Sequence, residues 1–402
     1  MLKILPLASS FHDPAQVRQS VNHIGSTLAS HHIAHDFVPE QGDIPNSLLI
    51  VTGGTEHLAL AALERMQGPA ILLAHPHQNS LPAALEILSR LQQMDRPGRV
   101  VLLNQGVEGY RSLAILSNLL GAHARLQGLR LGRIGAPSEW LVGSMPNPDL
   151  VAKTWGPNTI DVSLHLLTAA IQETAPEDTL PFQASFQSGA RRIGEPSGAD
   201  LNSAAKVGVA LRKIVREHGL DACTVRCFDL VKDLNTTGCL ALSALMDEGI
   251  VAGCEGDLPA ALTMVWLQAV TGQISFMANP QDLDPAANTL WLAHCTIARS
   301  MVKGYALRSH FESATGVGIQ GDLEPGPITL ARIGGRDLRE VFLTDGELLT
   351  NGDSDLRCRT QIQLKLQTDV RTLLEHPLGN HLVLIRGHWA EQLREYHRLF
   401  IH

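Results

Sequence analysis

The stretches that decide the fold are three short apolar runs near the start of the chain, SLLIVTGG (47–54), AILLAHP (70–76) and VVLLNQG (100–106). Apolar residues recur at helical spacing after these runs, over 56–66, 81–94 and 109–126. The same alternation reaches back to the first residues of the chain. Strands that alternate with helices in this way predict a parallel sheet covered by helices on both faces.

The alternation continues past residue 130 and then changes character. A second set of strand and helix patterns runs to about residue 300, with a strand expected over 224–230. After that point, short apolar runs alternate with Gly, Asp and Pro turns, which is typical of a small antiparallel barrel or sandwich. The sequence therefore predicts two Rossmann-like α/β domains with parallel sheets, over 1–130 and 131–300, and then a small antiparallel β-barrel-like domain over 301–402.

Composition restricts the kind of ligand. The 402 residues carry a net charge of −8 with a pI near 6.1, and no basic run offsets that average. Because phosphate contacts need clustered Lys and Arg, we expect no nucleic-acid partner and a small substrate. No uninterrupted apolar window of about 18 residues occurs, so a membrane-spanning helix is not expected.

The cysteines and the first residues predict a cytoplasmic protein. The chain has six cysteines with no CxxC pair, and it is far longer than the small secreted domains that depend on disulfides. The opening stretch MLKILPLASSFHDP lacks the apolar core and the cleavage site of a signal peptide. We therefore expect reduced thiols in the cytoplasm.

The segment richest in chemical signals is TTGCLALSALMDEGIVAGCEGDLPAALTM (236–264). It reads as a helix, a short strand, a tight glycine corner and a second helix. Glu255 stands at the end of the strand, immediately before Gly256 and Asp257. Since Asp is a good helix cap and Glu is a poor one, we expect Asp257 to cap the second helix and Glu255 to serve a functional site.

Four motifs accompany this corner: CEGDLPAAL (254–262), SFMANPQD (275–282), LAHC (292–295) and GNHLVLIRG (379–387). Together they resemble the L-fucose and L-arabinose isomerase superfamily, three-domain aldose–ketose isomerases that use a divalent metal, typically Mn²⁺. The resemblance implies that Glu255, His294 and His381 hold the metal and that Glu255 is also catalytic. It further implies a homo-oligomer with sites near subunit interfaces.

The chain departs from the family pattern at Ala278 and Asn279, where the resemblance places a second catalytic carboxylate. Asn279, assigned to this catalytic position, can coordinate a hard cation through its carbonyl oxygen but cannot take up a proton. Asp282 or Asp257 could stand in for the missing acid if the loop folds back.

The residues that we consider for substrate binding are His77, Gln78, Asn79, Trp140 and His310. The first three follow a predicted strand, and the resemblance implies that N-terminal residues complete the site of a neighbouring subunit. An indole can stack on a sugar ring, and His310 can form a further pair with Glu312. The alternatives are a polar strand-end loop, a packed indole and, for His294, a hydrogen-bonded core histidine.

Three functions remain open at this point. The first is a metal-dependent aldose–ketose isomerase that acts on a small sugar or sugar derivative by an ene-diol or hydride-shift route. The second keeps the fold but changes the reaction to an epimerase or a lyase, because the carboxylate pair is broken at Asn279. The third is a sugar-binding protein without turnover.

Overall fold

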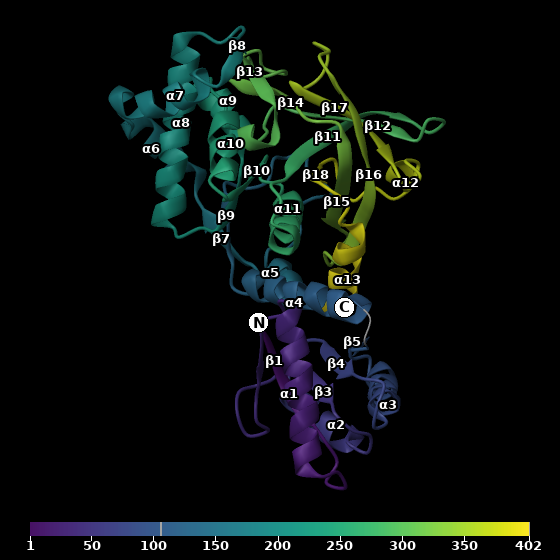
Figure 1. Ribbon diagram of the computed structural model, residues 1–402. Helices are drawn as coiled ribbons and strands as arrows, with labels where there is room; N and C mark the ends of the chain where they lie inside the picture. The colour runs from purple at the N-terminus through teal and green to yellow at the C-terminus, as the bar shows by residue number, and fades with distance from the viewer. Residues whose placement is uncertain (105–106, 402) are drawn as a thin grey trace. The chain divides into compact units, whose positions relative to one another are not determined.

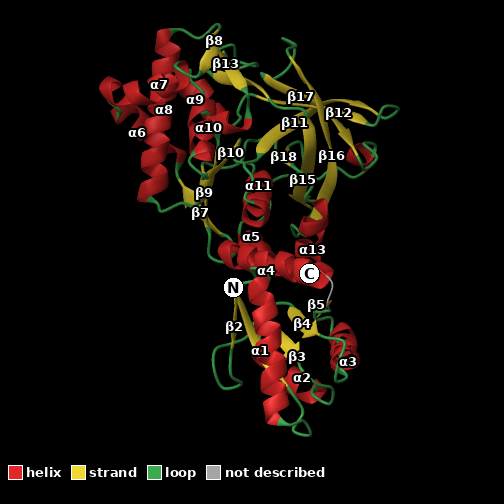
Figure 2. Ribbon diagram, viewed as in Figure 1, coloured by secondary structure: helices red, strands yellow, loops and turns green. Residues whose placement is uncertain are grey.

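The computed structural model describes residues 1–104 and 107–401. The chain divides into two compact units, one of residues 1–124 together with 395–402, and one of residues 125–394. Figures 1 and 2 show the elements of each unit. No helix in the described ranges is both long enough and apolar enough to cross a membrane.

The first unit contains a five-stranded parallel sheet in the order β2-β1-β3-β4-β5. Its strands are β1 (Leu2–Leu7), β2 (His35–Phe37), β3 (Ser47–Ile50), β4 (Ala70–Ala74) and β5 (Gly98–Leu102). Its helices are α1 (Pro14–Ser30), α2 (Glu56–Arg65), α3 (Ser80–Gln93) and most of α4 (Val107–Leu126). The predicted alternation is thus confirmed, and residues 105 and 106 of the third apolar run lie outside the described residues.

The second unit opens with a four-stranded parallel sheet in the order β10-β9-β6-β7. Its strands are β6 (Arg130–Ile134), β7 (Asn158–Val162), β9 (Ala222–Val225) and β10 (Val251–Cys254). The helices and short turns around it are α5 (Asp149–Trp155), α6 (Leu164–Glu173), η1 (Pro176–Thr179), α7 (Leu180–Gln187), α8 (Gly198–Glu217), α9 (Cys227–Leu234), α10 (Cys239–Asp247) and α11 (Leu258–Thr271).

One predicted strand in this unit is wrong in part. The strand expected over 224–230 ends at Val225, and α9 begins two residues later at Cys227. Leu230 is the one residue of α9 that is fully buried. A short apolar run cannot be told from such a helix by its pattern alone.

The rest of the second unit is a closed antiparallel barrel with the strand order β11-β12-β17-β16-β15-β18. Its strands are β11 (Phe276–Asp284), β12 (Thr289–His294), β15 (Gly326–Gly334), β16 (Glu340–Gly352), β17 (Thr360–Leu366) and β18 (Leu382–Arg386). A separate sheet pairs β8 (Ala190–Ile193), β13 (Gly304–Arg308) and β14 (Gly318–Asp322). The remaining elements are η2 (Arg299–Met301), α12 (Thr372–Glu375) and the first residues of α13 (Ala390–Phe400), a helix whose residues from 395 on belong to the first unit.

The predicted fold class, with two parallel α/β sheets and then a small antiparallel barrel, is confirmed. The division into three domains at 130 and 300 stays a prediction, and two of the barrel strands precede residue 300.

Helix α11 connects the sheet to the barrel, since it packs against β10, β15 and β18. Nearly all of its residues are buried, and Thr263 accepts a hydrogen bond from the Ile333 amide of β15 at 2.9 Å. These contacts fix the position of α11 against the barrel.

Candidate active site

The corner between β10 and α11 has an unusual backbone. Glu255 has a φ of 62°, and Gly256 follows with a φ of 71°. A left-handed conformation is uncommon for a residue other than glycine, and it is often retained at functional sites. A Cβ on Gly256 would lie 2.8 Å from the carbonyl oxygen of Ala136, so only glycine fits there. The corner thus turns sharply and leaves the Glu255 side chain at the wall of a cavity.

Asp257 caps α11, as the sequence predicted. Its Oδ1 accepts a hydrogen bond from the Ala260 amide at 2.9 Å. The same carboxylate pairs with both terminal nitrogens of Arg332, at 3.1 and 3.2 Å, and Arg332 is fully buried. It also accepts a hydrogen bond from Nδ1 of His381 at 2.8 Å. Asp257 therefore connects the helix, a buried arginine and a candidate ligand.

The contact with Asp257 orients the His381 ring. With Nδ1 directed to the carboxylate, Nε2 faces the site and lies 3.3 Å from Oε1 of Glu255. This nitrogen is buried and has no acceptable hydrogen bond to any residue that the structure describes. Histidines that bind metals commonly give the other ring nitrogen to a carboxylate. The His381 ring is therefore arranged as a metal ligand.

His294 completes the cluster from the end of β12. Its ring centroid lies 5.9 Å from that of His381, and one ligand atom each of Glu255, His294 and His381 fall within 4.8 Å of one another. Nδ1 of His294 faces the Thr296 amide at 3.2 Å, as in a hydrogen-bonded core histidine. In a neutral ring that accepts this hydrogen bond at Nδ1, the proton is on Nε2. His294 can therefore bind a metal through Nε2 only in the other tautomer, which loses the hydrogen bond from Thr296. The three residues fit a divalent ion, with His294 less prepared than the other two.

Burial and the charges within this cluster shift the pKa values of its histidines and of Asp257. Burial opposes a charge on His381, but the hydrogen bond to Asp257 and the negative charges of Asp257 and Glu255 raise its pKa to about 9. Burial also acts against ionised Asp257, and Arg332 and His381 nevertheless lower its pKa to about 2. Burial and the nearby His381 charge lower the pKa of His294 to about 3. The negative charges of Asp257 and Glu255 therefore favour a protonated His381 in the absence of another cation.

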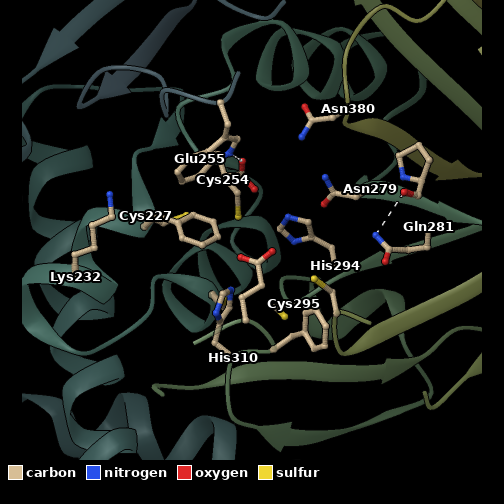
Figure 3. Close-up of a pocket in the computed structure, with 17 residues that line it drawn as sticks. Cys227, Lys232, Cys254, Glu255, Asn279, Gln281, His294, Cys295, His310 and Asn380 are labelled. Carbon is tan, nitrogen blue, oxygen red and sulfur yellow. Dashed lines mark hydrogen bonds between the residues drawn. The ribbon is translucent and has the colours of Figure 1, made fainter. Parts of the chain in front are cut away.

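The cluster borders a cavity of about 540 Å³, a size typical of small-ligand sites. Of the residues singled out in the sequence, it is lined by Trp140, Glu255, Asn279, His294 and His310. Figure 3 shows His294 near the centre of this group, with Asn279 beside it. The structure thus brings together one residue of β11 and one of β12 with three residues outside strands and helices, Trp140, Glu255 and His310.

Neither acid proposed to replace the missing carboxylate does so. Asp282 points away from the cavity toward Arg357, 3.4 Å from its guanidinium, and its side chain is largely exposed. Asp257 is fully buried and committed to Arg332 and His381. Asn279 itself does line the cavity. A further carboxylate in the wall, Glu312, had been noticed in the sequence only as a partner for His310.

Trp140 contacts the carboxylate as well as the cavity. Its indole N–H donates to Oε2 of Glu255 at 2.6 Å. The same ring packs edge-on against Phe228, with centroids 4.9 Å apart, and Phe228 packs edge-on against His310 at 5.5 Å. This aromatic wall positions Glu255. The role of Trp140 and His310 in substrate binding stays a prediction.

His77, Gln78 and Asn79 lie in the other compact unit, between β4 and α3. Gln78 and Asn79 both have positive φ values, 54° and 56°, and the Gln78 carbonyl accepts a hydrogen bond from the Gly53 amide at 2.8 Å. These two residues line a separate cleft of about 320 Å³, which His77 does not line. Their assignment to a sugar site stays a prediction.

Five of the six cysteines gather around the cavity, which the sequence did not reveal. They come from separate elements, and all are free thiols. The five are Cys227, Cys239, Cys254, Cys295 and Cys358. Burial raises the pKa of Cys239, so this thiol is a small apolar side chain rather than a thiolate ligand.

Comparison with known proteins points to sugar isomerases. No protein-family model matches the chain. A sulfoquinovose isomerase of Alkalicoccus urumqiensis is 23% identical over 298 residues, which cover 72% of this chain and 67% of that protein. A sulfoquinovose isomerase of Clostridium sp. (strain MSTE9) is 35% identical over 85 residues, 21% of this chain and 19% of that protein. A third, from Priestia aryabhattai, is 25% identical over 135 residues, 32% of this chain and 30% of that protein.

The first of these matches spans about two thirds of its relative, and the other two span less than a third. They support a sugar isomerase without assigning the chain to the fucose or arabinose isomerase branch. The chain is thus similar over most of its own length to one curated sugar isomerase, and over shorter stretches to others.

Proposed function

We propose that the chain is an aldose–ketose isomerase that moves a sugar carbonyl between C1 and C2 with the help of a divalent metal ion. The observation that carries this proposal is the convergence of Glu255, His294 and His381 at the wall of a small-ligand cavity. The similarity to curated sugar isomerases supports the reaction class.

The donor set supports a first-row divalent ion such as Mn²⁺. It has one carboxylate and two imidazoles, and oxygen and nitrogen ligands suit such ions better than soft, thiolate-binding metals. When bound, the ion would polarise the carbonyl and hydroxyl oxygens of the sugar. Asp257 would hold the His381 ring in place, and Trp140 would hold the Glu255 carboxylate.

We further propose that the substrate carries an anionic group at the end remote from its carbonyl. The relatives are named for sulfoquinovose, a sulfonated sugar. Among the described residues that line the cavity, Lys232 is the one lysine or arginine. The amides of Asn279, Gln281 and Asn380 line the same cavity and suit sugar hydroxyls.

The direct test is an assay of the purified protein after chelation and again after addition of Mn²⁺. Sulfoquinovose and glucose form a matched pair that differs in the anionic group, and L-fucose and L-arabinose test the other branches. We expect metal-dependent ketose formation, with sulfoquinovose preferred to glucose. Nuclear magnetic resonance of the products that revealed an epimer or a cleaved sugar would favour the epimerase or lyase alternative, and binding without turnover would favour a sugar-binding protein.

A second expectation concerns Asn279. Asn279→Asp should tighten divalent-metal binding by about tenfold or more, since it adds a negative charge beside the cation with little change in volume. Titration calorimetry on the chelated protein measures this change. Gln281→Glu is the matched control, because it adds the same charge to the cavity wall at a residue that is not assigned to the metal site. Equal affinities for Asn279→Asp and the wild type would place Asn279 outside the coordination sphere.

Assembly also remains a proposal. The resemblance to the isomerase superfamily implies a homo-oligomer in which the loop over 74–80 contributes to a neighbouring subunit's site. Sedimentation that detects only monomers at micromolar concentration would remove this part of the proposal.

A further inference from the structure

The cavity wall contains a second carboxylate that the site described above does not use. Among the described residues that line the cavity, Glu255 and Glu312 are the two acids. Glu312 lies in the loop over 309–317, which connects β13 to β14. Its chain position is unrelated to the Ala278–Asn279 position at which the second acid was expected.

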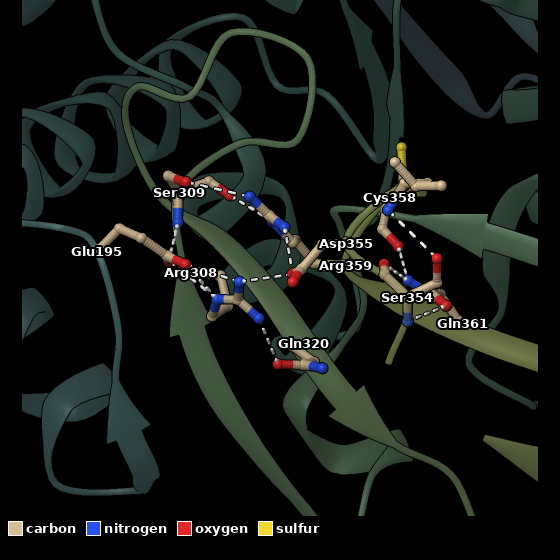
Figure 4. Close-up of polar contacts among 10 residues, drawn as sticks. Glu195, Arg308, Ser309, Gln320, Ser354, Asp355, Cys358, Arg359 and Gln361 are labelled. Atoms are coloured by element: carbon tan, nitrogen blue, oxygen red, sulfur yellow. Dashed lines mark hydrogen bonds and ion pairs between the residues drawn. The ribbon is translucent and has the colours of Figure 1, made fainter. Parts of the chain in front are cut away.

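The loop that carries Glu312 is anchored at its first end by a buried arginine. Arg359 donates to the carbonyl oxygen of Ser309 at 2.7 Å and to its hydroxyl at 3.1 Å. Glu195 accepts from the Ser309 amide at 3.1 Å and also pairs with Arg308 at 2.6 Å. Figure 4 shows these contacts around Ser309.

The other end of the loop is held just as closely. The hydroxyl of Thr237 donates to the Val317 carbonyl at 2.7 Å and accepts from the Val317 amide at 2.9 Å, and both residues are buried. Within the loop, the His310 amide donates to the Thr315 carbonyl at 3.0 Å. The backbone beneath Glu312 is therefore fixed at both sides, as a group that must meet a reacting atom requires.

The two acids of the cavity differ in how their oxygens are engaged. Glu255 accepts from Trp140 and lies beside His381, and these two neighbours lower its pKa despite its burial. Glu312 has no hydrogen bond or ion pair to any residue within 1–104 or 107–401. Its partial burial and the negative charge of Glu255 raise its pKa. Its oxygens are free to meet a substrate.

We propose that Glu312 is the acid–base group that carries the proton between C2 and C1 of the sugar. This assignment rests on the proposed isomerase function and replaces the acid missing at Asn279. The geometry favours Glu312 over Glu255 for this task, because Glu255 belongs to the metal cluster while Glu312 faces the same cavity unengaged.

The step is balanced without a further reactant. Glu312 takes the proton from C2, the electron pair of that C–H bond forms a C1–C2 double bond, and O1 takes up a proton from water. The carboxyl group then returns its proton to C1, the O2–H bond releases its proton to water, and the C2 carbonyl forms. Glu312 ends in its starting state, and no oxidant or reductant is consumed.

The test compares Glu312→Gln, Glu312→Asp and the wild type in deuterated water with Mn²⁺ present. We expect Glu312→Gln to lower kcat by about 10²–10⁴-fold and to abolish deuterium uptake at C1 of the ketose. Metal affinity should stay unchanged, since Glu312 lies outside the ligand cluster. Glu312→Asp keeps the carboxylate and should retain more turnover than Glu312→Gln. The matched control is Glu217→Gln, the same chemical change on the exposed end of α8.

The outcomes separate this assignment from the function on which it rests. If Glu312→Gln turns over as fast as the wild type, the assignment is overturned and the isomerase function stands. Loss of metal from Glu312→Gln would make Glu312 a ligand and also overturn it. A wild type that forms ketose without deuterium uptake would replace proton transfer by a hydride shift. A wild type that isomerises no aldose would overturn both the function and the assignment.

Discussion

Replacing Glu255 by glutamine is expected to weaken divalent-metal binding and, through the loss of the ion's charge stabilisation, to lower kcat by about 10²–10³-fold. The amide keeps the shape of the side chain, and its oxygen can still accept from the Trp140 indole. The substitution removes the negative charge of Glu255, whose Oε1 lies 3.3 Å from Nε2 of His381. The proposed ion would be bound by these two groups. Loss of a charged ligand and loss of turnover should therefore occur together.

Calorimetric metal titration and steady-state kinetics on the same preparation measure the two effects. Glu217→Gln is again the matched control, because that glutamate is exposed on α8 and far along the chain from the cluster. If Glu255→Gln binds metal as the wild type does and still turns over, the cluster is not the active site. If it loses metal but excess Mn²⁺ restores full turnover, Glu255 is a ligand without a further catalytic role.

Alternating apolar runs were sufficient to predict the fold class because strands such as β3 and β4 are short, buried along their whole length and followed by a helix. The error over 224–230 arose where this signal is weakest, since Cys227 and Phe228 are apolar residues separated from the end of β9 by Arg226 alone, but they belong to a helix. The closed barrel was predicted only as a barrel or sandwich. Closure depends on pairing between strands such as β11 and β18, about a hundred residues apart, and no local pattern encodes it.

The candidate site was predictable where chemistry is local. The Glu255–Gly256–Asp257 corner carries its own signals, because the cap, the glycine and the strand end lie within three residues. The second role of Asp257 was not predictable, since Arg332 and His381 lie 75 and 124 positions away in the sequence. Glu312 reaches the cavity from a loop whose anchors, Thr237 and Arg359, are 80 and 50 positions away from the residues they hold.

Replacing Asp257 by alanine is expected to destabilise the second unit by about 3–5 kcal/mol. Arg332 is fully buried, and without Asp257 its guanidinium loses its one carboxylate partner among the described residues. His381 loses the acceptor for Nδ1, so its ring orientation is no longer fixed. Metal affinity should fall by about 10–100-fold, as is typical when the residue that orients a ligand is removed.

Denaturant unfolding of the chelated protein, followed by tryptophan fluorescence, measures the stability of the second unit, because all five tryptophans lie within residues 125–394. Ser197→Ala is the matched control: it removes the N-cap of α8 without touching a buried charge and should cost about 1 kcal/mol. Equal losses for the two variants would mean that the buried pair with Arg332 adds nothing beyond the cap. Should Asp257→Ala fail to fold, Asp257→Asn keeps the volume and an oxygen for the cap while it removes the charge. Its metal affinity then tests the role in holding His381, and wild-type affinity in that variant would contradict it.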